Sequence, residues 1–151
     1  MSSCFFIGHR DTPDSIRPLL EQVIERHIVV YGVTEFYVGH QGRFDSMAAH
    51  ALARAKERHL AIRNYLLLAY HPSVMRVEKP AGFACTLLPE GQESVPPRFA
   101  VVRRNRRMLR EADYLICYVR GVTGGSYKLL QTAKGLEKKG RLTITNLAEC
   151  T

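Results

Sequence analysis

Residues 113–130 read DYLICYVRGVTGGSYKLL, and this stretch decides the fold class. An apolar run of strand length comes first, a glycine-rich turn follows, and a helical pattern begins directly after the turn. The same order is typical of a buried strand that leads into a helix in an α/β protein. Gly124 and Gly125 stand at the turn, where the missing side chains allow another group to approach the backbone closely.

The succession of strand, turn and helix recurs along the rest of the chain. Hydrophobic patterning predicts strands at 4–7, 35–39, 62–70, 113–119 and 142–147. Helices are expected after the first strand, with an apolar stripe from Ile16 to Ile24, and at 46–58, 98–112 and 125–139. Residues 71–97 hold five of the seven prolines and are expected to form a long loop.

Five strands that alternate with four helices predict an α/β fold. We expect one domain over residues 1–151, built as a three-layer α/β/α sandwich around a mostly parallel five-stranded sheet. Right-handed crossovers place the ends of the first, second and fourth strands at the carboxyl edge of this sheet. Ligands bind at that edge in such folds.

Glycine and polar residues follow these three strands. The turns are Gly8-His9-Arg10, Gly39-His40-Gln41-Gly42 and Gly124-Gly125-Ser126. At the third turn, backbone N–H groups, a helix N-terminus and the Ser126 hydroxyl would suit a phosphate. The alternative is a plain tight turn that needs glycine for its backbone angles.

Charge and composition narrow the partners. The net charge is +8 and favours an anionic partner, either nucleic acid or a phosphorylated small molecule. The longest apolar stretch, 65–70, is too short for a membrane span, and the N-terminus lacks the pattern of a signal peptide. Four scattered cysteines without metal-type spacing are expected to be reduced thiols, so we predict a cytoplasmic protein with no metal site and no membrane contact.

Several polar side chains are candidates for the site, each with a structural alternative. Asp45 could cap the second helix or accept hydrogen bonds from a ribose or base. Asn105 lies on the buried stripe of the basic helix and could bind a loop or line the site, and Arg104 could reach the strand edge. Glu90 is the one acid of the long loop that could reach the cleft, although surface exposure is the simpler interpretation.

The motifs resemble those of the SLOG superfamily of Rossmann-like proteins, and most closely its bacterial branch related to YpsA. The similarity runs nearly end to end, through FIGHRD, FYVGHQGRFDSMA, LLLAYHP, LLPEGQESVPPRFAVVRRNRRM, ADYLICYV, GGSYKLLQTAKGLEKKG and ITNL. The resemblance implies a Rossmann-like fold and a nucleotide or nucleotide-derived ligand, of the AMP, NAD or ADP-ribose type. It also implies that self-association is common, so a homo-oligomer is an open expectation.

The superfamily includes the LOG phosphoribohydrolases, which cleave the N-glycosidic bond of cytokinin nucleotides. Their arginine motif resembles RNRRMLREAD, which would place Arg104 on the catalytic arginine. The glycine pair also matches, but Tyr127 and Lys128 replace Gly-Thr, and Gln131 stands where the acid should be. Glutamine cannot ionise, so another acid, Asp45 or Glu90, would have to replace it.

We therefore expect a nucleotide-binding or sensing protein whose phosphate lies at the third glycine turn. A LOG-like hydrolase is the second expectation, with Arg104, Asp45 and Glu90 as catalytic candidates. Single-stranded nucleic-acid binding, as in the related DNA-processing protein A, is the third. The expected ligand contacts are Gly8, His9, Arg10, Gly39, Gln41, Gly42, Asp45, Arg104, Asn105, Gly124, Gly125 and Ser126.

Overall fold

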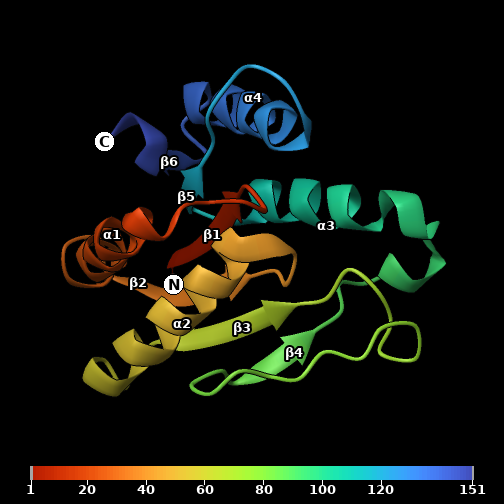
Figure 1. Ribbon diagram of the computed structural model, residues 1–151, viewed down its shortest axis with the longest axis horizontal. Helices are drawn as coiled ribbons and strands as arrows, with labels where there is room; N and C mark the ends of the chain where they lie inside the picture. The colour runs from red at the N-terminus through yellow and green to blue at the C-terminus, as the bar shows by residue number, and fades with distance from the viewer. Residues whose placement is uncertain (1, 151) are drawn as a thin grey trace.

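The computed structural model describes residues 2–150 and contains one six-stranded sheet in which all neighbouring strands are parallel (Figure 1). The strand order is β4-β3-β2-β1-β5-β6. The strands are β1 (Ser2–Gly8), β2 (Val33–Val38), β3 (Arg63–Leu67), β4 (Cys85–Leu87), β5 (Tyr114–Tyr118) and β6 (Thr143–Asn146). The helices are α1 (Arg17–Val29), α2 (Gly42–Arg58), α3 (Pro97–Glu111) and α4 (Gly125–Lys138), with short 3-10 turns η1 (Asp14–Ile16), η2 (Gln92–Ser94) and η3 (Leu147–Glu149).

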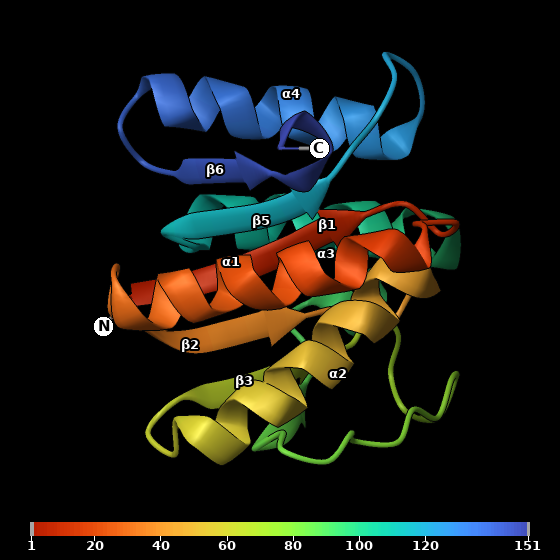
Figure 2. The ribbon, with the colours of Figure 1, turned by 60° about the vertical axis from the view of Figure 1, so that its left-hand side comes forward.

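Helices cover both faces of the sheet, which confirms the predicted α/β/α layers. Figure 2 shows α1 and α2 in front of the strands and α3 behind them. Alternate residues of β1 contribute to two hydrophobic cores, one on each face of the sheet. Phe6 packs with α1 and α2, and Phe5 packs with α3 and α4. Within residues 2–150, no helix combines the length and the apolar character that a membrane crossing needs.

The expected number of strands was wrong by one. Strand β4 lies inside 71–97, which we expected to be loop throughout, and it pairs with β3 in parallel. With only three residues it is too short to show a period of two, and prolines lie on both sides of it. The chain reaches β4 from β3 without a helix, since residues 68–84 contain only turns and irregular backbone.

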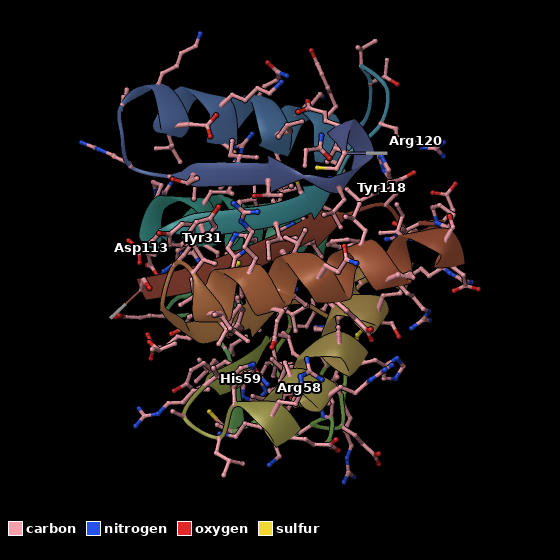
Figure 3. The ribbon with its side chains drawn as sticks, turned by 90° about the vertical axis from the view of Figure 1, so that its left-hand side faces the viewer. Tyr31, Arg58, His59, Asp113, Tyr118 and Arg120 are labelled. Carbon is pink, nitrogen blue, oxygen red and sulfur yellow. The ribbon has the colours of Figure 1, made fainter. Side chains whose placement is uncertain are left out.

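The topology creates a crevice between β1 and β5. Crossovers through α1 and α2 carry the chain one way from β1, and α3 then returns it to the other side. The loops after β1 and β5 therefore diverge, and such a switch point is where open α/β sheets bind ligands. In Figure 3, Tyr118 and Arg120 lie at this carboxyl edge, whereas Asp113 and Tyr31 lie at the opposite edge.

Strand β6 is an edge strand whose outward backbone is partly satisfied. The N–H of Thr143 donates to the carbonyl of Asp113 next to β5, at 3.0 Å. The next N–H, on Ile144, turns outward and donates to the Glu137 carboxylate of α4 at 3.0 Å. A side chain of the covering helix thus occupies a position that another strand would need.

Candidate functional site

A cavity of about 340 Å³ lies at the switch point, within the size range of small-molecule sites. It brings together nine of the predicted residues: Gly8, His9, Arg10, Gln41, Asp45, Arg104, Asn105, Gly125 and Ser126. Residues from β1, α2, α3 and α4 therefore meet there, although they are far apart in the sequence.

The start of α4 forms one wall of the cavity and has free backbone donors. Gly124 is the N-cap, with φ of 94°, and no side chain caps the helix. The first helical hydrogen bond runs from the N–H of Lys128 to the carbonyl of Gly124 at 3.2 Å. The N–H groups of Gly125, Ser126 and Tyr127 have no partner within residues 2–150.

Gly125 has no structural reason of its own to lack a side chain. Its φ is not positive, and a Cβ built on it would meet no heavy atom within 4 Å. The space beside it belongs to the cavity, which Gly125 and Ser126 both line. The Ser126 hydroxyl donates to the carbonyl of Gly8 at 3.4 Å and so connects α4 to the end of β1.

The start of α2 also follows a glycine turn, but oxygen atoms of the protein accept hydrogen bonds from N–H groups there. The N–H of Arg43 donates to the carbonyl of Arg10 at 3.2 Å, and that of Phe44 donates to the carbonyl of His9 at 3.4 Å. The N–H of Gln41 donates to Asp45 Oδ2 at 3.0 Å, so Asp45 caps α2. No anion can use N–H groups that are already bonded to protein oxygens.

Arg104 is buried beneath the cavity and binds two side-chain amides. It is 1% exposed. Its Nε and Nη2 donate to Asn105 Oδ1 at 3.1 and 2.9 Å, and its Nη1 donates to Gln41 Oε1 at 2.7 Å and to the carbonyl of Leu67 at 3.3 Å. Because a guanidinium can only donate, both amides must present oxygen to it. Their NH₂ groups are then directed away from Arg104, and both residues line the cavity.

Burial and the charge of Arg104 set the electrostatics around α2. Burial raises the pKa of Asp45 to about 6, although Arg104 and the N–H of Gln41 pull it down. Burial and then Arg104 lower the pKa of His40 to about 4. The His40 ring is therefore neutral at physiological pH, and burial in this region disfavours charge of either sign.

His9 joins the loop after β1 to the loop after β5. Its Nε2 accepts the N–H of Arg120 at 2.9 Å, so the proton of the neutral ring is on Nδ1. The ring also meets Tyr118 edge-on, at 5.9 Å between centroids, and the Arg120 guanidinium lies over the same tyrosine at 5.6 Å (Figure 3). These contacts fix one side of the crevice.

Two basic residues of the cavity had not been singled out as ligand contacts. Arg106 lies on α3, and Lys128 lies one turn into α4. Together with Arg10 they make the lining strongly positive. The spacing of Lys128 from the glycine pair was a usable signal, because a residue one turn into the helix remains close to its N-terminus.

Three predicted ligand contacts, Gly39, Gly42 and Gly124, do not line this cavity, and neither does the catalytic candidate Glu90. Gly39 and Gly42 line a smaller neighbouring hollow of about 210 Å³, which Asp45 also lines. The Glu90 side chain is exposed, and its carbonyl accepts a hydrogen bond from Arg107 at 2.7 Å. Within residues 2–150, no three His, Cys, Asp or Glu side chains gather where they could hold a metal ion.

No family model matches the chain, and a search of curated proteins finds no match. The resemblance to the SLOG superfamily therefore rests on the sequence motifs and remains a prediction.

Proposed function

We propose that this protein binds a small phosphorylated ligand, a nucleotide or nucleotide derivative, in the cavity between β1 and β5. The ligand phosphate would lie against the start of α4. The protein would bind the ligand in order to sense it or carry it. The observation that supports this proposal is the unfilled start of α4, where free N–H groups border a cavity with a basic lining.

The cavity suits a ligand of modest size. Its volume of about 340 Å³ lies at the lower end of the range for small-molecule sites and favours a mononucleotide over a dinucleotide. Val101, Val102 and Leu129 give part of the lining an apolar character that would accommodate a base or sugar ring. Arg10, Arg106 and Lys128 would neutralise the phosphate.

Hydrolysis of an N-glycosidic bond is a second candidate, and Asp45 supports it. A carboxyl with a pKa of about 6 in a ligand cavity can serve as a general acid or base near neutral pH. Against this candidate, Asp45 already caps α2, and Gln131 offers no carboxylate. Nucleic-acid binding has less support, because Arg103 and Arg107 are held by Gln92 and by the carbonyl of Glu90.

Thermal unfolding with a ligand panel tests the proposal. AMP, ADP-ribose and NAD are added to the wild type, to Gly125→Asp and to a control, Gly135→Asp. Gly135 lies on the same helix, is exposed, and has nothing within 4 Å of an added Cβ. A bound ligand at about 100 times its Kd adds roughly 2.7 kcal/mol and several degrees to the midpoint.

We expect a rise for the wild type and for Gly135→Asp and none for Gly125→Asp, whose carboxylate would occupy the phosphate position. No rise with any nucleotide would contradict the proposal. A steady-state assay for release of the free base, on whichever nucleotide binds, separates the hydrolase from the binding protein.

A further inference from the structure

The cavity contains many hydrogen-bond donors and a single carboxylate. Arg10, Arg106, Lys128 and the start of α4 can only donate, and they match an anion. Asp45 is the only acid among the lining residues. A ligand made of phosphate alone would place negative charge near this carboxylate and leave it without a partner.

Asp45 has one oxygen in use and one without a partner. The residue is 7% exposed, and its Oδ2 accepts the N–H of Gln41. Its Oδ1 has no hydrogen-bond partner within residues 2–150, and it is not among the fully enclosed atoms that lack one. Asp45 lines both the main cavity and the smaller hollow beside it, so this oxygen can receive a donor from a bound molecule.

The missing donor has to be neutral. Burial first, and then the charge of Arg104, lower the pKa of His40 to about 4, so a cation is disfavoured in this part of the site. Arg10, Arg106 and Lys128 add further positive charge. An ammonium or guanidinium group of a ligand would be repelled, whereas hydroxyl groups donate without carrying charge.

We propose that the ligand is a phosphorylated sugar, alone or within a nucleotide, and that Asp45 selects it by accepting hydrogen bonds from neighbouring sugar hydroxyls. The inference rests on the proposed function, since the phosphate at α4 positions the sugar. A free carboxylate oxygen accepts two hydrogen bonds, which suits two adjacent hydroxyls such as those of ribose. Asp45 thus has two roles: one oxygen accepts the N–H of Gln41 before α2, and the other accepts hydrogen bonds from the ligand.

Calorimetric titration of the full chain at pH 7.5 tests this assignment. The probes are inorganic phosphate, ribose 5-phosphate and 2-deoxyribose 5-phosphate. We expect ribose 5-phosphate to bind at least about tenfold more tightly than either of the others, the factor expected for a hydrogen bond to a charged group. Equal affinity of the ribose and deoxyribose compounds for the wild type would overturn the inference without any variant.

The variant Asp45→Asn provides the second arm. Its single oxygen can still accept the N–H of Gln41, which leaves an NH₂ group, a donor, in place of the free carboxylate oxygen. We expect the preference for ribose over deoxyribose to fall below about twofold, while inorganic phosphate binds more tightly because a negative charge is gone. A preference that survives in Asp45→Asn contradicts the role of Asp45.

The variant Gly125→Asp separates this inference from the proposed function. If ribose and deoxyribose phosphates bind equally and Gly125→Asp abolishes both, the phosphate site stands and the role of Asp45 fails. If none of the three compounds binds the wild type or Gly135→Asp, the proposed phosphate site itself fails. The thermal midpoint of each unliganded variant confirms that it is folded.

Discussion

Helices α2 and α4 begin at the same edge of the sheet after similar glycine turns, yet only one of them is open. At α2, the carbonyls of His9 and Arg10 accept the N–H groups of Phe44 and Arg43. At α4, no group within residues 2–150 fills the equivalent positions. A glycine turn before a helix therefore does not identify an anion site until the partners of its N–H groups are known.

The glycines of the two turns serve different neighbours. A Cβ on Gly42 would lie 2.8 Å from the Arg10 Cα, and one on Gly39 would lie 2.7 Å from Arg104 Nη2. These residues are small because the protein itself fills the space. A Cβ on Gly125 would meet no protein atom within 4 Å, and the residue lines the cavity in which we propose that the ligand binds.

The largest effect should be on the free energy of unfolding, when one methyl group is added to each turn in a separate variant and the two variants are compared. We expect Gly42→Ala to lower the free energy of unfolding by about 2–4 kcal/mol, because φ is 85° and the Cβ meets a backbone atom. Gly125→Ala should change it by less than about 0.5 kcal/mol and reduce ligand affinity instead. Urea denaturation measures the free energy of unfolding of both variants. Equal losses of stability would contradict the difference that we infer between the two turns.

A smaller effect should come from the carboxylate that closes α2. The folded pKa of Asp45 is about 6 and its ordinary value is 3.8, so the folded state binds this proton more tightly than the unfolded chain. The contribution of Asp45 to stability is thus full below pH 4 and is lost as the pH rises to about 6.

Asn cannot ionise, so the stability of Asp45→Asn relative to wild type should improve between pH 4 and pH 7.5. The expected change is on the order of 2 kcal/mol, measured as the difference in unfolding free energy at the two pH values. His27 and His40 titrate in both proteins and cancel in this difference. A flat difference would mean that Asp45 is ionised in the folded protein already near pH 4.

The smallest effect is local and compares the two turns directly. We expect the amide signals of Gly125, Ser126 and Tyr127 to shift when phosphate is added in an NMR titration, because their N–H groups are free. The amides of Arg43 and Phe44 should stay in place, since carbonyls hold them. Shifts of similar size at both turns would show that α2 also receives the anion.

The sequence was sufficient for the layers and for the edge of the sheet at which the cavity lies. Apolar runs and helical stripes are local patterns, and right-handed crossovers then bring the ends of β1, β2 and β5 together. Strand β4 was missed because three residues carry no period, and its pairing with β3 is a tertiary contact.

The roles of individual site residues were harder to predict. Whether a turn is open depends on where the His9 and Arg10 carbonyls point, and no local pattern encodes that. Arg104 was expected to contact the ligand. It lines the cavity, but its guanidinium donates hydrogen bonds to Gln41, Asn105 and Leu67 of the protein itself. Burial of an arginine is a property of the packed core, so the sequence alone could not show it.

The Glu137 carboxylate at β6 also bears on how the molecule behaves in a crowded solution. An exposed outer strand is the usual starting point for stacking of identical chains into fibres. Because the outward N–H of Ile144 already has an acceptor, an incoming chain would have to displace a negatively charged side chain before it could pair there. The Glu137 side chain therefore protects the edge of the sheet at β6 against pairing with another chain. We expect Glu137→Gln to aggregate more readily than the wild type, and Glu137 does not line the ligand cavity.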